Sequence, residues 1–468
     1  MKITTKTLAY LWFPIYVALI GLTLDNTLPY KGDESYYIAS SIRMIQSGNF
    51  IVPVYFDEVR FQKPLITYWL TVTGYTIFGI NLWSGRLIFL MLSCMLLILV
   101  YKFALLILPD TEFAYLNVFL LSSATLFVEF TRVSMSDMPL TLFTTLGLYY
   151  FCKALQEPER LNRYYLFAYI SMGFAYSSKG FIGIFPCLAI GVYLFCTRPE
   201  TYKKYLLWLF HPLYILVFSL LAFSWYLYAY FYHFDDLMKQ FTIESSATFA
   251  SNLHPIPGNI FSYLNVLFTY YLPFTPIAAY LYVKKRTKLP SQLFPIVFYI
   301  GITLVLLTLL VSRHKPRYLL VTFPALTLVI SYIIYHSHFR ETAKKIAIVV
   351  AGLQIAVFLI YPPISGSPLK ELIQYWEGNL RGDLATYNLS RREISWAQAL
   401  SHGRLQAYRE ESDYLLVEAE HINDFETPEI IKQAARLSKI RIEKGKLVKQ
   451  ERTYFLIKSH TVNVDYKR

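Results

Sequence analysis

Charged residues are scarce in this chain of 468 residues. Only 16% of its residues are Asp, Glu, Lys or Arg, whereas about a quarter is usual in a soluble protein. Hydrophobic residues make up 55% of the chain. This composition excludes an ordinary soluble protein and predicts a polytopic membrane protein. The net charge of +13 is spread over short loops between apolar segments, so we expect no nucleic acid partner.

Several common site motifs are also missing. There is no Gly-rich phosphate loop and no cytoplasmic Asp-x-Asp run, which argues against binding of a nucleotide-activated substrate. We find no internal repeat and no low-complexity segment. The cysteines all fall inside apolar segments without metal-ligand spacing, so we interpret them as packing residues: they are Cys94, Cys152, Cys187 and Cys196.

Apolar segments of spanning length are abundant. Lys2 and Lys6 precede an apolar run at 8–24 that lacks a small-x-small cleavage site, so we interpret it as an uncleaved first span. Ten further segments follow, which predicts about eleven transmembrane helices: 84–108, 111–129, 138–156, 164–178, 180–196, 206–232, 260–283, 291–311, 318–336 and 346–363.

The positive-inside rule orients these segments. If the amino terminus is cytoplasmic, every inner loop is basic: these loops carry Lys153, Arg160, Arg163, Arg198, Lys203, Lys204, Lys284, Lys285, Arg286, Lys288, Arg340, Lys344 and Lys345. The outer face then holds the exceptions, namely Arg60, Lys63, Arg132, Lys179, Arg313, Lys315 and Arg317. A basic cluster on that face needs an anionic partner.

The character of the chain changes after residue 363. We therefore predict a transmembrane domain at 1–363, with a first outer loop at 25–83, and a small soluble α/β domain at 364–468 on the outer side. Alternating residues predict strands at 413–419 and 453–458, and a helix is expected near 428–437. No catalytic motif occurs in this second domain.

The first outer loop concentrates the acidic and basic residues. Residues 34–45 place apolar side chains along one side of a helix, which we expect to lie in the membrane interface. Pro64 suits the first turn of a second short helix, and we expect the rings of Tyr68 and Trp69 at the headgroup level.

Five motifs in this order resemble the lipid-dependent glycosyltransferases of the GT-C type. They are Asp33-Glu34 after the first span, Phe61-Gln62-Lys63-Pro64-Leu65 with Tyr68-Trp69, Arg132 to Asp137-Met138-Pro139-Leu140, Ser178-Lys179-Gly180, and Lys315-Pro316-Arg317-Tyr318 with Pro324. The likeness is greatest to the aminoarabinose transferase that modifies lipid A and to the protein mannosyltransferases. It covers about 360 residues.

The resemblance implies an inverting transfer of a sugar from a polyprenyl phosphate to an acceptor outside the bacterial cytoplasmic membrane. The acceptor is a lipid A-like glycolipid, a polysaccharide or a protein. Such a displacement needs a base for the acceptor proton and cations for the departing phosphate. Asp33 matches the family's first-loop acid and is our candidate base, although it also precedes a helix and suits a cap. Glu34 either holds a divalent ion, positions Asp33 or serves a surface role.

The remaining candidates surround the donor. Lys63 is the first choice for the donor phosphate, and the further members of a cationic pocket are Lys179, Arg313, Lys315 and Arg317. Any of these is also explained as a headgroup anchor. Asp137 is expected to pair with Arg132 or to orient a basic residue. Tyr37 and Tyr318 match aromatic positions near the donor, although an interfacial role fits both.

Two departures from the family pattern concern whether a metal binds and which sugar is transferred. His254 resembles a histidine that contributes to a metal site in some members, with Glu34 as a second ligand, but it also suits a plain loop. The aminoarabinose transferases have an acidic residue where this chain has Gln62 and a basic residue where it has Tyr36. No cofactor is therefore assigned beyond this possible divalent metal, and the sugar stays open.

Two other classes of protein remain as alternatives. A transporter or flippase of a lipid-linked sugar usually places its ionisable residues near the membrane midplane, often in repeated halves. Here the charges gather at the outer ends of the spans. A receptor or scaffold leaves Asp33 and Lys63 unexplained.

Overall fold

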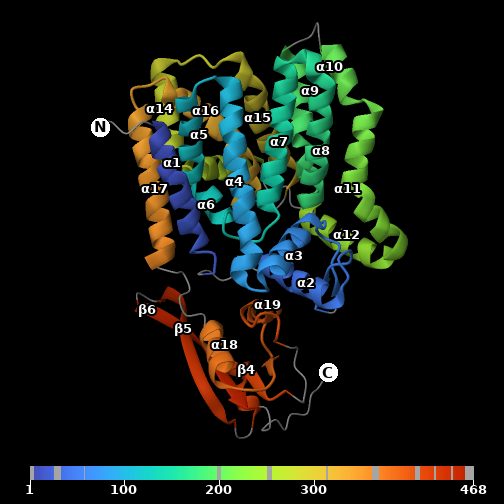
Figure 1. The fold of residues 1–468 in the computed structure, drawn as a ribbon, viewed down its shortest axis with the longest axis vertical. Helices are drawn as coiled ribbons and strands as arrows, with labels where there is room; N and C mark the ends of the chain where they lie inside the picture. Colours follow the sequence, from blue (N-terminus) through green and yellow to red (C-terminus); the bar gives the residue numbers. More distant parts are fainter. Residues whose placement is uncertain are drawn as a thin grey trace.

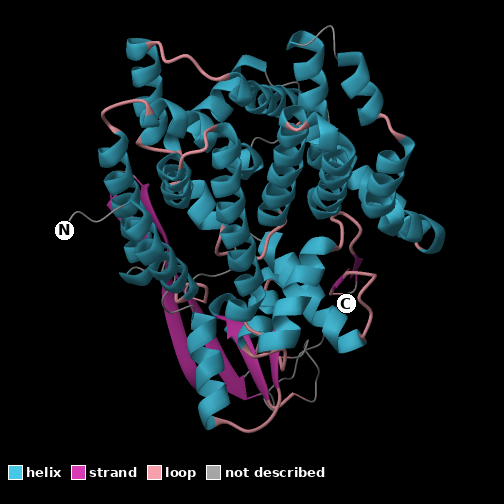
Figure 2. Ribbon diagram, turned by 45° about the horizontal axis from the view of Figure 1, so that its top comes forward, coloured by secondary structure: helices cyan, strands magenta, loops and turns pink. Residues whose placement is uncertain are grey.

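The fold is taken from a computed structural model. It describes residues 5–25, 33–56, 58–197, 202–249, 256–311, 315–360, 368–405, 412–425, 428–443 and 446–458. Helices form a long bundle, and the larger sheet lies beyond one end of it (Figures 1 and 2). Arg313, Asp57 and His254 lie outside the described residues.

The bundle consists of apolar helices, because a helix satisfies its own backbone groups without water. Its first half contains α1 (Thr5–Gly21), α4 (Leu82–Ile107), α5 (Thr111–Ser123), α6 (Thr125–Phe130), α7 (Asp137–Gln156), α8 (Leu161–Lys179) and α9 (Phe185–Thr197). Its second half contains α10 (Tyr202–Leu209), α11 (Pro212–Tyr232), α13 (Ile256–Thr269), α14 (Phe274–Lys285), α15 (Phe294–Leu310), α16 (Phe323–Tyr335) and α17 (Arg340–Ile360). Short 3₁₀ turns join or extend them: η1 (Pro158–Arg160), η2 (Phe181–Ile184), η3 (Ser291–Leu293) and η4 (Pro316–Thr322).

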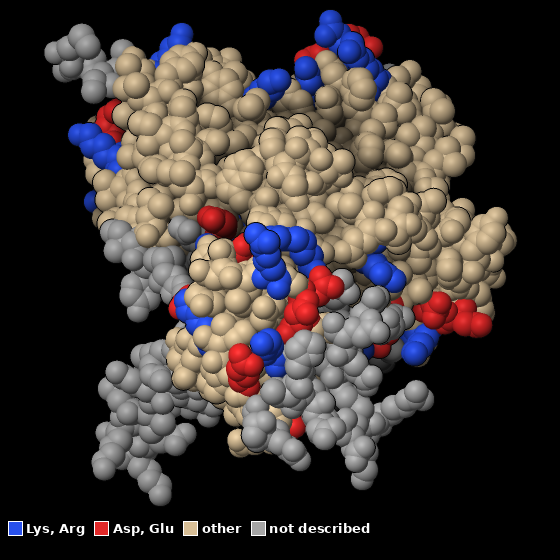
Figure 3. Space-filling view, turned by 60° about the horizontal axis from the view of Figure 1, so that its bottom comes forward, with Lys and Arg blue, Asp and Glu red and all other residues tan. Residues whose placement is uncertain are grey.

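Five helices in the described residues are long and apolar enough to cross a membrane. A sixth span results if α13 and α14, which meet at 100°, are taken together. In Figure 3, charged side chains gather at the upper rim and from the centre downward, and the broad band between these two zones shows few of them. The chain is therefore a multi-pass membrane protein. Each apolar segment predicted from the sequence contains at least one helix.

Polar caps fix where helices begin. Asn81 accepts the Ser84 N–H at 2.8 Å at the start of α4. Asp110 accepts the N–H groups of Glu112 and Phe113 at 2.7 and 3.2 Å at the start of α5. These side chains satisfy backbone donors that have no partner within the helix.

Two short helices and a hairpin lie across one end of the bundle (Figure 1). They are α2 (Asp33–Ser47), α3 (Ile66–Phe78), β1 (Val54–Tyr55) and β2 (Glu58–Val59), and α12 (Phe234–Phe249) lies beside them. The helix predicted at 34–45 is confirmed. Its position in the membrane interface stays a prediction.

The apolar residues of α2 are covered on two sides. Tyr37 and Met44 pack against Tyr68 of α3. Ile38 and Ile42 pack against Ala399, which belongs to the region after residue 367. The ring of Tyr68 is fully buried against Tyr37, whereas Trp69 is 46% exposed; the expected position of the two rings at the headgroup level stays a prediction. Pro64 lies just before α3 rather than in its first turn.

The residues after 367 form a sheet with helices. They comprise α18 (Pro368–Asn379), β3 (Leu384–Tyr387), α19 (Arg391–Leu400), β4 (Tyr414–Glu418), η5 (Ala419–Asp424), β5 (Ile430–Glu443) and β6 (Lys446–Lys458). The strand order is β3-β4-β6-β5, with β3 parallel to β4 and the other pairs antiparallel. The core on one face contains Trp376, Leu416 and Leu456.

One secondary-structure prediction in this part is wrong. Strands predicted at 413–419 and 453–458 are confirmed by β4 and β6, but the helix expected near 428–437 is strand β5. This segment contains good helix formers such as Lys432 and Ala434. Pairing with β6, where Ala434 is opposite Tyr454, outweighs that local preference because it completes a ladder of backbone hydrogen bonds.

The contact between α3 and α4 leads to a stability prediction. A Cβ at Gly74 of α3 would lie 2.2 Å from the carbonyl oxygen of Ser84 in α4. Gly74→Ala must therefore push the two helices apart and should lower the free energy of unfolding by about 1–3 kcal/mol. Gly301→Ala in α15, where no atom lies within 4 Å of the added Cβ, is the control. Equal thermal unfolding midpoints for both variants in detergent would contradict this close packing.

Candidate active site

Asp33 begins α2 and faces cations from a distant part of the chain. Its Oδ2 forms an ion pair with Arg317 and lies 3.8 Å from Lys315 Nζ, both in or next to η4. Burial alone raises the pKa of Asp33, but the nearby charges of Arg317 and Lys315 outweigh burial and hold that pKa below its usual value. The Asp33 side chain remains 33% exposed. This carboxylate is therefore ionised and within reach of a ligand.

A second ion pair joins the ends of α7 and α8. Asp137, the first residue of α7, pairs through Oδ1 with Lys179, the last residue of α8. Lys179 Nζ also lies 4.8 Å from the ring centroid of Tyr318. The expected partner of Asp137 was Arg132 or another basic residue, and the structure places Lys179 there.

The two ion pairs belong to one cluster. Lys179 lies close enough to Asp33 to affect its carboxyl electrostatically, and Lys63 is in electrostatic range of Lys179. Three cations, Lys179, Lys315 and Arg317, thus pair with the two carboxylates of Asp33 and Asp137, and Lys63 lies in electrostatic range of this cluster. The surplus of positive charge favours an anionic ligand.

Buried atoms in this cluster lack hydrogen bonds. Asp137 Oδ2 and Arg317 Nε are both buried without a partner among the described residues. Leaving such atoms unsatisfied costs about 1–3 kcal/mol each. A polar ligand that bonds to them would recover this free energy.

Glu34 is fully buried in a separate ion pair. Arg86 Nε and Nη2 donate to its two carboxylate oxygens at 2.8 and 2.9 Å, and the Ser134 N–H donates to Oε1 at 2.8 Å. This arrangement does not fit the expected catalytic, metal-binding or surface role, because both oxygens are engaged and solvent is excluded. Glu34 instead fixes the first turn of α2 and thereby positions Asp33, which was one of its predicted roles.

Arg132 lies outside the cluster. Its Nε and Nη2 donate to the hydroxyl and the carbonyl oxygen of Thr23, both at 2.8 Å. Its guanidinium stacks 3.7 Å from the ring centroid of Phe358. The predicted pair with Asp137 is therefore wrong. Arg132 satisfies a carbonyl just beyond the end of α1, where cations are favoured.

Aromatic rings line the side of the cluster formed by α2 and α3. Tyr37 is buried with its ring 4.9 Å from that of Tyr68, and its hydroxyl lies near Ser136, next to Asp137. Tyr318 lies beside Lys179 and Arg317. Both tyrosines predicted to support the site thus border it.

Sequence reasoning left Arg60 out of the site. Its guanidinium carbon lies 3.6 Å from the ring centroid of Tyr36, and it is within electrostatic range of Tyr37 and Tyr68. Its Nε is buried and makes no hydrogen bond within the described part of the chain. Polar and apolar residues alternate in Glu58-Val59-Arg60-Phe61, which predicts an extended segment with Arg60 on the side opposite its two apolar neighbours. This alternation is the sequence feature that could have identified Arg60 as a site residue.

The described residues offer no metal centre. They contain no group of three or more His, Cys, Asp or Glu side chains that could hold an ion. Arg313 and His254 lie outside the described residues. Glu34 does not fit as a metal ligand because Arg86 occupies its oxygens.

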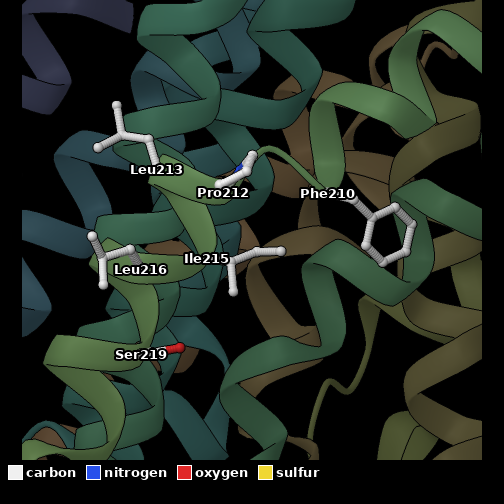
Figure 4. Close-up of a pocket in the computed structure, with 6 residues that line it drawn as sticks. All are labelled: Phe210, Pro212, Leu213, Ile215, Leu216 and Ser219. Atoms are coloured by element: carbon white, nitrogen blue, oxygen red, sulfur yellow. The ribbon is translucent and has the colours of Figure 1, made fainter.

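An apolar pocket of about 600 Å³ lies far from these charges. Phe210, Pro212, Leu213, Ile215, Leu216 and Ser219 line it at the start of α11 (Figure 4). This part of α11 is at the end of the bundle opposite α2 (Figure 1). Its lining provides no acid, base or cation, so the chemistry belongs to the Asp33 cluster.

The chain is similar in sequence to known membrane glycosyltransferases and to further proteins. Residues 62–227 match the dolichyl-phosphate-mannose-protein mannosyltransferase family. Two proteins of Aquifex aeolicus are each 28% identical over 64% of this chain, covering 58% and 67% of their own lengths. An undecaprenyl phosphate-alpha-4-amino-4-deoxy-L-arabinose arabinosyl transferase of Proteus mirabilis is 27% identical over 38% of this chain and 33% of its own length. The chain thus spans only about a third to two thirds of these relatives.

Solved structures match over nearly the whole chain. ArnT from Cupriavidus metallidurans, bound to undecaprenyl phosphate, superposes with a TM-score of 0.71 at 14% identity, covering 98% of this chain and 99% of ArnT. Its apo state gives a TM-score of 0.72, covering 97% and 98%. The described chain therefore has the GT-C fold of ArnT, and the resemblance predicted from the motifs is confirmed.

The Glu34–Arg86 pair gives a prediction about folding. Glu34→Leu leaves the Arg86 guanidinium buried without its acid and should lower the free energy of unfolding by about 3–5 kcal/mol. The double variant Glu34→Leu/Arg86→Met removes both charges and should be clearly more stable than the single variant. Thermal unfolding in detergent measures both. A double variant as unstable as Glu34→Leu would contradict the assigned pairing.

Proposed function

We propose that this chain, which has the GT-C fold of ArnT, is an inverting glycosyltransferase. It moves a sugar from a polyprenyl-phosphate donor to a cell-envelope acceptor on the outer side of the bacterial cytoplasmic membrane. The acceptor is a lipid A-like glycolipid, a polysaccharide or a protein. The observation that carries this proposal is the cluster around Asp33, where one accessible carboxylate faces a surplus of cations.

The proposed topology has eleven spans with the amino terminus in the cytoplasm. Residues 1–363 form the membrane domain, with its first outer loop at 25–83, and residues 364–468 form an α/β domain on the outer side. The position of α2, α3 and the larger sheet at the same end of the bundle supports this arrangement (Figure 1). The basic residues of the predicted inner loops support it as well.

The donor phosphate binds among Lys63, Lys179, Lys315 and Arg317, with Arg313 as a further cation. Two observations support this placement: the surplus of positive charge, and the buried Arg317 Nε that has no partner among the described residues. Tyr318 beside Lys179 adds an aromatic surface to the same pocket.

Asp33 acts as the general base. The acceptor oxygen attacks the anomeric carbon, its proton passes to the Asp33 carboxylate, and the bond from that carbon to the phosphate oxygen breaks. The bonding electrons leave with the phosphate, where the cations stabilise the growing negative charge. A donor phosphate also competes with Asp33 for Arg317 and Lys315 and thereby raises the basicity of Asp33 when the substrate is in place.

The arrangement of carboxylates favours inversion. A retaining transfer needs a second carboxylate as nucleophile. Asp137 is paired with Lys179 and Glu34 with Arg86, so among the described acids of the cluster only Asp33 is both ionised and accessible. One base serves a single displacement, which inverts the anomeric carbon.

A transporter or flippase of a lipid-linked sugar is the alternative. Such proteins place ionisable groups near the midplane in broken helices. Here Asp33 begins α2, Asp137 begins α7 and Lys179 ends α8. Charges at helix ends, grouped around one base, favour transfer over transport.

Asp33→Asn tests the base. An amide cannot accept the proton, so the rate of transfer should fall about 10²–10⁴-fold. Consumption of a polyprenyl-phosphate sugar by the purified protein measures the rate, and Asp25→Asn on the same side of the membrane is the control. Near-normal turnover of the Asp33→Asn protein would remove the base assignment.

Lys63→Ala tests the phosphate site. The loss of a charge-assisted bond should raise the KM for the donor about 10–100-fold and leave the KM for the acceptor nearly unchanged. Lys345→Ala, which removes an exposed lysine of α17, is the matched control. An increase confined to the acceptor KM would show that Lys63 does not bind the donor.

A further inference from the structure

The side-chain amide of Gln240 bridges two backbone groups of the first outer loop. Gln240 belongs to α12, yet its Nε2 donates to the Val59 carbonyl oxygen and its Oε1 accepts the Phe61 N–H. One amide carries both a donor and an acceptor, so it can satisfy residues on both sides of Arg60. Gln240 lies about 180 residues from Val59 and Phe61 in the sequence.

These bonds complete the restraint of a three-residue segment. The Arg60 N–H donates to the Pro53 carbonyl oxygen at 2.8 Å, so a backbone group of each residue from Val59 to Phe61 has a fixed partner. Phe61 is buried, with its ring 5.5 Å from Trp225 and 5.4 Å from His233. This segment is therefore seated on the end of α11 and on α12.

The bridge determines which side chains face the site. Successive side chains of an extended segment point to opposite sides, and a slip by one residue exchanges the two sides. In the observed register Phe61 packs toward α11, while Arg60 stacks on Tyr36 of α2 at 3.6 Å. Apolar packing alone does not fix this register, because it has little directionality. The two hydrogen bonds of Gln240 are directional and, together with the bond from the Arg60 N–H to Pro53 and the pairing of β1 with β2, hold this register.

Lys63 depends on the same segment. It follows Phe61 by two residues, and two residues span at most about 7 Å. Its position is also bounded on the other side, because α3 begins at Ile66. A displacement at Phe61 therefore changes the path of the chain between Phe61 and Ile66 and, with it, the position of Lys63.

We propose that Gln240 is a positioning residue for the donor site, through which α12 holds Arg60 and Lys63 in place. This inference rests on the proposed function, since it assigns Lys63 to the donor phosphate. It gives α12, in the large outer loop, a defined part in assembling the site. Gln240 itself touches no substrate.

Binding of a sugar-free polyprenyl monophosphate tests this role. The full-length protein in detergent is titrated with this lipid, and its dissociation constant is compared with those of Gln240→Met and Gln240→Asn. Met keeps the length of the side chain without the hydrogen bonds, and Asn keeps the amide but is too short. Both variants should bind roughly tenfold more weakly. Lys239→Met, on the adjacent exposed residue, should bind like the unmodified protein.

Two further readouts separate positioning from general stability. In a transfer assay, the Gln240 variants should show a raised KM for the donor and an unchanged KM for the acceptor. Their unfolding midpoints without lipid should match that of Lys239→Met. Affinity that falls only together with the midpoint would overturn the positioning role.

The remaining outcomes are also decisive. If the unmodified protein binds the lipid and the Gln240 variants bind it equally well, this inference is wrong and the proposed function stands. If the unmodified protein does not bind a polyprenyl phosphate, the proposed function fails and this inference fails with it.

Discussion

The candidate site depends on the buried ion pair between Glu34 and Arg86. A charge in the interior of a membrane protein is costly unless it is paired and hydrogen-bonded, and this pair meets both conditions with the help of the Ser134 N–H. Its effect is geometric. By anchoring the first turn of α2 to α4, it fixes Asp33, the adjacent residue, at the edge of the bundle. There Asp33 faces the cations at η4.

Two neighbouring acids thus have different tasks because their surroundings differ. Glu34 is fully excluded from solvent, whereas Asp33 is 33% exposed. The pairs around Asp33 keep it ionised without closing it off, and the surplus of cations leaves room for a phosphate. The same cations that lower the pKa of Asp33 in the free protein would pair with the donor phosphate when the donor binds. In the proposed reaction, this exchange couples donor binding to the basicity of Asp33.

The sequence predicted the helical membrane architecture and the residues that gather at one end of it. Hydropathy and loop charge carry this information directly, because each depends on single residues and their spacing. The partners inside the cluster were less predictable. Asp137 pairs with Lys179 rather than Arg132, since the choice depends on how α7 and α8 meet. Arg86, a charge near the start of an apolar segment, was not among the predicted site residues; its position calls for a buried acid, but nothing in the sequence says that this acid is Glu34. Strand β5 was missed because its partner β6 overrides a local helical preference.

The most direct test of the account is the mass spectrometry of envelope lipids and glycans from cells with and without the intact protein. Transfer from a polyprenyl phosphate predicts that a single sugar-sized mass disappears from one envelope component when the protein is absent. The component that loses this mass also identifies the acceptor. Unchanged glycans together with lipid-linked sugar accumulating on the cytoplasmic side would contradict transfer and favour a transporter.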